Sequence, residues 1–158
     1  MKKKISFSLD SLELQDYQPN RYPFLMIDNV TKVIPGKLAE GYKNFTNNEW
    51  FFPVHFKGHP NVPGVLMLEA MAQMLTVAIT TLPGNKGKIT HAISHNVEFK
   101  KEINPGQKLV IKTKVNSWKR GLCHGSGKGF VNGEIVCEAS SMIITIPEIL
   151  AKYSPKNV

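Results

Sequence analysis

An almost continuous apolar segment from Val65 to Leu82 constrains the fold of this chain more than any other feature. Its polar exceptions follow one another at spacings of four, three and four residues, which places them on one stripe of a helix. They are Glu69, Gln73, Thr76 and Thr80. Pro63 suits the first helical position, and Pro83 ends the pattern. A helix that is apolar on all its other sides must be wrapped by other elements, so we expect it at the centre of the fold.

Alternating or β-rich segments surround this helix. We expect a short helical or irregular segment over residues 10–20. Tight turns are predicted at Pro35-Gly36 and at Asn132-Gly133, and the second is the turn of a two-residue hairpin. The expected strands span 24–34, 38–46, 88–101, 107–118, 122–131 and 134–146. We therefore predict the α+β class and one domain over residues 1–158, with an N-terminal segment (1–16) and a C-terminal tail (147–158).

Glu69 is the unusual residue of the central helix. An ionisable group in an apolar interior is unfavourable unless it is paired or neutralised. His55 lies fourteen residues earlier, in a turn rich in glycine and proline. The pair could act as an acid and a base, although a lone turn histidine and a lone helix glutamate are more often structural.

Several motifs, in order along the chain, carry a family resemblance. They are Arg21-Tyr22-Pro23-Phe24-Leu25-Met26-Ile27-Asp28, Asn48-Glu49-Trp50-Phe51-Phe52, His55-Phe56-Lys57-Gly58-His59-Pro60, Pro63-Gly64-Val65-Leu66, Glu69-Ala70-Met71-Ala72-Gln73, Phe99-Lys100-Lys101, Asn104-Pro105-Gly106-Gln107 and Val131-Asn132-Gly133-Glu134. Together they strongly resemble the (3R)-hydroxyacyl-[acyl carrier protein] dehydratases of the FabZ type, over roughly residues 17 to 146.

The resemblance implies a catalytic pair of His55 and Glu69. A histidine suits removal of the proton α to a thioester carbonyl, because imidazole titrates near neutrality. Glu69 would help the β-hydroxyl leave as water, either directly or through an oriented water. The backbone amides of Gly64 and Val65 could stabilise the enolate oxygen at a helix N-terminus. His59, which we expect to shape the turn, and Gln73 are the candidate supporting residues.

The resemblance also implies the hotdog fold, in which a curved antiparallel sheet wraps one long helix. In such dehydratases the histidine of one protomer faces the glutamate of its partner, so a homodimer is expected, with a trimer of dimers left open. The partner is an acyl carrier protein with a 3-hydroxyacyl chain. Because such carriers are acidic, Lys57, Lys100, Lys101, Lys119 and Arg120 are candidate docking charges. No cofactor and no metal are expected.

Composition narrows the function classes further. The net charge of +8 comes from scattered lysines, and no nucleic-acid-binding module is visible. No hydrophobic segment of a signal peptide follows the lysines at residues 2–4, which predicts a cytoplasmic protein, and the polar residues near the central helix argue against a membrane span. Cys123 and Cys137 predict reduced thiols. The glycines of residues 125–129 predict a closely packed strand rather than a phosphate loop.

The chain departs from the common family pattern at a few positions. Gln18-Pro19-Asn20 replaces Leu-Pro-His, Val54 replaces a glycine, Lys57 replaces a proline, and residues 93–96 replace a segment that is often Gly-Ile-Asp. These changes suit a specialised acyl or polyketide-like pathway as well as bulk fatty acid synthesis.

Two alternative functions stay open, a hotdog thioesterase and a catalytically silent hotdog subunit that binds acyl carrier protein. Isomerisation of the product is expected to be minor, and Met67, Met71 and Met74 could line an acyl tunnel or belong to the core.

Overall fold

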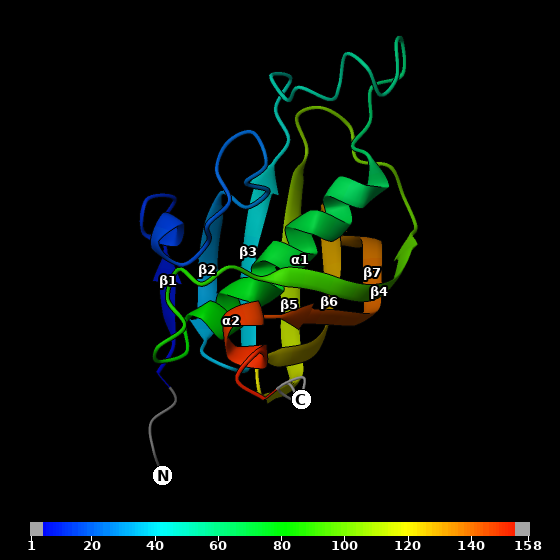
Figure 1. The fold of residues 1–158 in the computed structure, drawn as a ribbon. Coiled ribbons are helices and arrows are strands. Elements are labelled where there is room, and N and C mark those ends of the chain that lie inside the picture. Colours follow the sequence, from blue (N-terminus) through cyan, green and yellow to red (C-terminus); the bar gives the residue numbers. More distant parts are fainter. Residues whose placement is uncertain (1–4, 154–158) are drawn as a thin grey trace.

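The computed structural model describes residues 5–153, and its strands form one antiparallel sheet (Figure 1). The strand order is β1-β2-β3-β5-β6-β7-β4. The elements are β1 (Phe7–Leu9), the 3-10 helix η1 (Glu13–Asp16), β2 (Asn29–Ile34), β3 (Leu38–Asn44), α1 (Gly64–Thr80), β4 (His91–Phe99), β5 (Lys108–Lys119), β6 (Leu122–Val131), β7 (Glu134–Thr145) and α2 (Pro147–Leu150). Within the described residues, no helix combines the length and the hydropathy that a membrane crossing needs.

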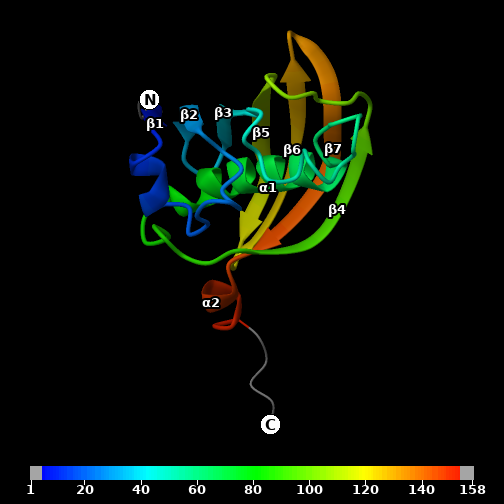
Figure 2. The ribbon, with the colours of Figure 1, turned by 90° about the horizontal axis from the view of Figure 1, so that it is seen from above.

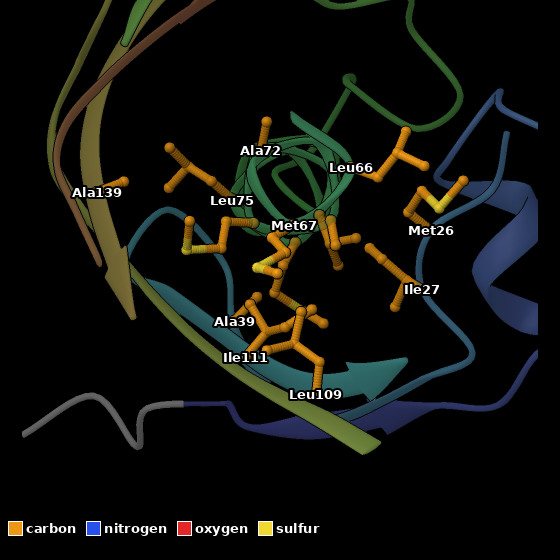
Figure 3. Packing of buried hydrophobic residues seen from close by; sticks show 14 of the residues in the cluster. Met26, Ile27, Ala39, Leu66, Met67, Ala72, Leu75, Leu109, Ile111 and Ala139 are labelled. Atoms are coloured by element: carbon orange, nitrogen blue, oxygen red, sulfur yellow. The ribbon is translucent and has the colours of Figure 1, made fainter. Parts of the chain in front are cut away.

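The sheet curves around α1, which lies on its concave side (Figure 2). Every residue of α1 from Ala70 to Thr80 is buried. Figure 3 shows Leu66 pointing toward Met26 and Leu75 pointing toward Ala139, so α1 packs against both the sheet and the loop before β2. The expected central helix wrapped by a curved sheet is confirmed. The cause is the apolar surface all around α1, which is stable only when it is covered on every side.

The glycines of β6 let neighbouring groups pack closely. Gly125, Gly127 and Gly129 are buried on the face toward α1, and a Cβ at Gly125 would lie 2.6 Å from Leu75 Cδ2. The prediction of a closely packed strand is therefore confirmed. The hairpin that follows is also confirmed, because Asn132 (φ 50°) and Gly133 (φ 82°) both take the left-handed conformation that a two-residue turn requires.

Several predicted boundaries were wrong. The strand predicted to start at residue 24 starts at Asn29, because the chain turns first: the N–H groups of Phe24 and Leu25 both donate to the carbonyl of Arg21, at 2.8 and 3.0 Å. The strand predicted over 88–101 is only His91–Phe99, since the N–H groups of Lys100 and Lys101 converge on one carbonyl, that of Val136. A strand cannot continue where two successive amides share one acceptor.

The ends of the chain and of α1 also differ from the expectation. Pro63 precedes α1 as its N-cap instead of occupying its first turn, and α1 ends at Thr80. Strand β1 lies in the N-terminal segment and α2 in the C-terminal tail, and neither was predicted. Residues 1–4 and 154–158 of these two segments lie outside the described residues.

Strand β4 forms one edge of the sheet, with β7 as its neighbour. It carries two large, exposed apolar side chains, Ile93 (58% exposed) and Phe99 (46%), and the ring of Phe99 lies next to Gly64 of α1. His95 and Val97 are its half-buried residues, and Val97 packs against the core. A register shift between Ala92 and Ser94 precedes them. The edge therefore presents nine residues of strand for pairing and turns His95 toward the interior.

Candidate active site

The turn that carries His55 is anchored by aromatic packing. Phe51 lies edge-on to both Phe45 and Phe52, with ring centroids 6.1 and 4.8 Å apart. Its carbonyl then accepts a hydrogen bond from the N–H of His55 at 2.9 Å. Lys43, which bridges Asp28 at 3.3 Å and Glu49 at 2.8 Å, ties the start of the turn to the sheet. These contacts explain why the aromatic motif precedes the histidine in the sequence.

The half-buried imidazole of His55 has a defined tautomer. Its Nδ1 lies 3.0 Å from the carbonyl oxygen of Asn61. A carbonyl can only accept, so Nδ1 carries the proton and Nε2 is left with a lone pair. The ring of Phe56 stacks on the imidazole at a centroid distance of 4.0 Å and limits its rotation. This arrangement orients a neutral histidine to act as a base through Nε2.

The N-terminus of α1 lies next to this turn. Gly64 and Val65 are the first two residues after the N-cap, and the first intrahelical bonds are made by later amides, those of Leu66 and Met67 to the carbonyl of Pro63. Their N–H groups are therefore available to an external acceptor. Gly64 lines a pocket of about 290 Å³, whose other walls are Asn61, Val62, Met67, Phe99, Lys100, Lys101 and Glu102.

Close packing makes a side chain at Gly64 unsuitable. A Cβ at this position would lie 2.9 Å from Cδ2 of Phe99. Met67 lines the same pocket, whereas Met71 and Met74 are fully buried in the core. Of the three methionines, only Met67 is thus placed to contact a ligand in this pocket.

Gln73 holds the carboxylate of Glu69. Its Nε2 donates to Glu69 Oε1 at 2.7 Å and to the carbonyl of Phe24 at 2.8 Å, while its Oε1 accepts from the N–H of Met26 at 2.8 Å. Gln73 is only 3% exposed. Both of its amide protons and its oxygen are engaged, so the orientation of the amide is fixed, and with it the position of Oε1 of Glu69.

Arg21 organises the loop that packs against Glu69. Its guanidinium donates to the carbonyls of Gln15, Gln18 and Asn20, at 3.1, 2.7 and 2.9 Å. This loop brings Nδ2 of Asn20 to 3.5 Å from Oε1 of Glu69. The Arg-Tyr-Pro-Phe motif therefore acts on the site through the backbone it supports, which is a structural role.

His95 is a residue near Glu69 that sequence reasoning missed. Burial lowers its pKa from the ordinary value of 6.5, and the charge of Glu69 acts in the opposite direction. Its Nδ1 is the one buried side-chain nitrogen or oxygen without a hydrogen-bond partner in residues 5–153. The available signal was the departure from the family pattern at residues 93–96, but the face of β4 that carries His95 depends on the register shift before it.

Of the other predicted residues, His59, Lys100 and Lys101 lie around the His55 turn and the Gly64 pocket, whereas Lys119 and Arg120 lie at the turn between β5 and β6. His59 is exposed and forms an ion pair with Glu102 at 2.9 Å, and its backbone closes the turn with Phe56. Lys100 lies between Glu98 (3.2 Å) and Glu138 (3.5 Å), which together raise its pKa, and Lys101 pairs with Glu134. The charge of both lysines is therefore partly offset by neighbouring carboxylates.

Within one chain, the structure does not bring all the predicted catalytic groups into one pocket. Five residues separate Gly64 from Glu69, which corresponds to a rotation of about 140° around the helix axis. Glu69 lines a different pocket from the one that contains Gly64. His55 and the helix N-terminus thus lie on one side of α1, and Glu69 with Gln73 on another.

The thiols and the acidic groups offer no alternative chemistry here. Burial raises the pKa of Cys123 to about 12 and that of Cys137 to about 11, so both thiols stay protonated. Among residues 5–153, His, Cys, Asp and Glu side chains form no group of three that could hold a metal ion.

Comparison with known proteins defines the class. The sequence profile of the FabA-like domain matches residues 18–140. The 3-hydroxyacyl-[acyl-carrier-protein] dehydratase FabZ of Bacillus licheniformis is 42% identical over 135 residues, which cover 85% of this chain and 94% of that protein. FabZ of Bacillus subtilis strain 168 is 41% identical over 131 residues, which cover 82% and 93%. The chain therefore belongs to the FabZ family of 3-hydroxyacyl-[acyl-carrier-protein] dehydratases.

Solved structures share the fold at much lower identity. The dehydratase heterocomplex ApeI:P of Xenorhabdus doucetiae superimposes with a TM-score of 0.74 at 14% identity, covering 90% of this chain and 97% of that one. A hypothetical thioesterase with coenzyme A from Streptococcus pneumoniae TIGR4 gives 0.58 at 14% identity, covering 74% and 83%. The hotdog fold implied by the sequence is confirmed.

We expect His95 to make the stability of the protein depend on pH. Because its folded pKa lies below the unfolded value of 6.5, the unfolded state binds the proton more readily. Stability is therefore full above about pH 6.5 and falls as the pH drops toward the folded pKa. In His95→Gln, the loss of unfolding free energy between about pH 7.5 and about pH 5.5 should be smaller, as measured by urea unfolding.

The matched control is His124→Gln. His124 is exposed and hydrogen-bonded to Ser141 at 3.0 Å, so its removal should leave the pH dependence as it is in the unmodified protein. If His95→Gln and His124→Gln lose stability to the same extent over this range, then burial of His95 does not control the acid sensitivity.

Proposed function

We propose that this chain converts (3R)-3-hydroxyacyl thioesters on acyl carrier protein to the trans-2-enoyl thioesters, with His55 as the base and Glu69 as the acid. The observation that carries the proposal is membership of the FabZ family over most of the chain. The fixed tautomer of His55 and the fixed carboxylate of Glu69 support the assignment of the two residues. Neither the thioesterase nor the silent subunit has a specific observation in its favour.

The first step removes the α-proton. Nε2 of His55 has the free lone pair for this task, and the bond from Nδ1 to Asn61 stabilises the imidazolium that forms. Asn61 also lines the Gly64 pocket, so the base is hydrogen-bonded to a residue in the wall of the pocket that would receive the thioester. Negative charge then develops on the thioester oxygen. The N–H groups of Gly64 and Val65 are positioned to donate to it at the positive end of the helix dipole.

The second step expels the β-hydroxyl. Glu69 supplies a proton to the hydroxyl oxygen, which leaves as water while the double bond forms. Gln73 acts through Glu69 and is a positioning residue, since its amide fixes Oε1 and leaves Oε2 for the substrate. His59 supports the turn through its ion pair with Glu102 and its backbone bonds.

A homodimer completes the site in this proposal. His55 and Gly64 lie on a different side of α1 from Glu69, so one acyl group reaches both sets only if a second chain supplies one of them. The open edge of β4, with its exposed Ile93 and Phe99, can pair with the same edge of another copy. A trimer of dimers, a cytoplasmic location and a minor isomerase activity stay predictions.

Substitution of either catalytic residue should abolish most of the activity. We expect His55→Ala and Glu69→Gln each to lower kcat/KM for dehydration by at least about a hundredfold, the scale of a lost acid or base. The measurement follows the 2-enoyl product and free thiol together, which separates dehydration from thioester hydrolysis. His59→Ala, which removes an exposed ion pair, is the matched control and should have a milder effect. Unchanged turnover in a folded His55→Ala protein would exclude His55 as the base.

Refolding of mixed chains tests the shared site. If inactive His55→Ala and Glu69→Gln chains are unfolded, mixed and refolded, about half of the dimers should contain one chain of each kind. In such a dimer one site has both lesions and the other has neither, so activity should return to about a quarter of that of the unmodified protein. Native mass spectrometry establishes that mixed dimers have formed. If these remain inactive, the two residues act within one chain.

Docking of the carrier protein should depend most on Lys57. It is exposed two residues after His55, forms no ion pair within residues 5–153, and follows the exposed apolar side chains of Val54 (70%) and Phe56 (55%) in the same turn. Lys101 is already offset by Glu134. We therefore expect Lys57→Glu to lower kcat/KM for the carrier-bound substrate more than Lys101→Glu does.

The comparison substrate is a short thioester without a carrier protein. For this substrate, the kcat/KM of both variants should equal that of the unmodified protein. Added salt should narrow the difference between the two substrates, because exposed charges are screened. Lys32→Glu makes the same charge change on exposed strand β2 and serves as the control. Equal losses on both substrates would instead indicate damage to the pocket.

A further inference from the structure

A small polar pocket adjoins Glu69 on the side of α1 that faces the N-terminal loop and β4. It has a volume of about 100 Å³. Its polar walls come from three parts of the chain, the loop after η1, α1 and the segment before β4. They are Gln18, Asn20, Glu69, Gln73, Thr76 and Thr90, with Ala72, Ala92 and Ile144 as the apolar walls. We call this pocket the Glu69 chamber.

The hydrogen bonds around the chamber fall into two groups. Those of Gln73 to Glu69, Phe24 and Met26 are short, at 2.7 to 2.8 Å. The bonds of the other polar walls are long: 3.4 Å from Gln18 Nε2 to the carbonyl of Gln73, 3.5 Å from Asn20 Nδ2 to Glu69, and 3.4 Å between the hydroxyls of Thr76 and Thr90. Bonds of this length are weak, so these groups keep donor and acceptor capacity for another partner.

The volume of the chamber limits which molecule can occupy it. Each water occupies about 30 Å³ in the liquid, so the volume suits about three water molecules, and it is too small for an acyl chain. A buried water also needs two to four polar partners, which the amides and hydroxyls of the walls provide. Both size and chemistry therefore indicate water.

The sequence adds an independent point. The common family pattern has leucine and histidine where this chain has Gln18 and Asn20, and both residues line the chamber. Gln18 is only 2% exposed. A buried amide in place of an apolar side chain is unfavourable unless it has hydrogen-bond partners, and its one bond to protein here is long. The change therefore makes this chamber more hydrophilic than the common pattern would.

We propose that the Glu69 chamber takes up the water eliminated from the substrate and holds it until the enoyl product leaves. This role rests on the proposed dehydration. The Cα–H bond breaks with transfer of the proton to His55, its electrons form the Cα=Cβ bond, and the Cβ–O bond breaks as the oxygen takes a proton from Glu69. One water is thus formed for each enoyl thioester. A proton passed from His55 to Glu69 through water restores both residues.

Oxygen labelling tests this role. The substrate is a 3-hydroxyacyl carrier-protein thioester with ¹⁸O in its hydroxyl, and an enoyl reductase removes the released product. In the reverse reaction, water adds to the bound enoyl thioester and re-forms the substrate. If the chamber holds the eliminated water, the re-formed hydroxyl contains the original ¹⁸O. The substrate recovered at half conversion should therefore keep its label. In Gln18→Leu and Thr76→Val the water exchanges with solvent, so the recovered substrate should lose label. We expect kcat to fall by up to about tenfold in each, the scale of one lost hydrogen bond, with KM unchanged.

The controls separate this role from a structural one. Thr81→Val removes a hydroxyl that bonds the carbonyl of Val77 at 2.8 Å outside the chamber, and it should retain label like the unmodified protein. A purely structural defect slows turnover without changing the label kept at equal conversion. Loss of label from the unmodified protein, or equal retention in Gln18→Leu, Thr76→Val and Thr81→Val, overturns the proposal. If the unmodified protein forms no enoyl product, the dehydratase function itself is refuted.

Discussion

The side-chain amide of Gln73 is the contact on which the candidate site depends. It links α1 to the loop before β2, because it bonds the carboxylate of Glu69, the carbonyl of Phe24 and the N–H of Met26. A carboxylate in an apolar helix is stable only with such a partner. Because the amide has no spare donor or acceptor for a different arrangement, it also fixes where the carboxylate lies. Stability of the helix and orientation of the acid thus come from the same three bonds.

The same helix separates the two halves of the proposed chemistry. Its N-terminus presents free amide N–H groups near His55, because the first turn of a helix has no internal acceptors for them. Glu69 lies about 140° around the axis, against the N-terminal loop. The helix lies on the concave side of the sheet (Figure 2), and its residues from Ala70 to Thr80 are buried, so the two groups stay on different sides of α1 within one chain. In the proposed homodimer, a second chain paired through the β4 edge would supply the missing group without any rearrangement of the core.

The positions at which the chain departs from its family lie on both sides of the candidate site. Gln18 and Asn20 line the Glu69 chamber, and His95 is held near Glu69 with an unpaired ring nitrogen. Val54 and Lys57 are exposed in the turn that carries His55. The departures therefore change the surroundings of both candidate catalytic residues and leave His55 and Glu69 themselves in place.

The hydrophobic pattern and the turn residues of the sequence were sufficient to predict much of the fold. The almost wholly apolar surface of α1 requires other elements around it, and Asn132-Gly133 favours a tight turn with both residues left-handed. His55, Gly64 and Glu69 were predicted from the family motifs, with Gln73 as a supporting residue, but the motifs did not specify the hydrogen bonds that orient them. Those bonds are made by Asn61, Gln73 and the loop that Arg21 supports.

The strand boundaries and the environment of His95 were decided only by the tertiary structure. Residues 24–28 have strand-like composition, yet the chain turns first, because the amides of Phe24, Leu25 and Met26 bond Arg21 and Gln73 instead of a neighbouring strand. His95 is turned toward Glu69 and the interior, and β4 has register shifts on both sides of it, between Ala92 and Ser94 and between Asn96 and Val97, which interrupt the alternation of its faces. Sequence determines which residues can form a strand or a helix and which chemistry they carry. Which face they present, and to what, depends on pairing with segments distant in the chain, and only the folded protein determines it.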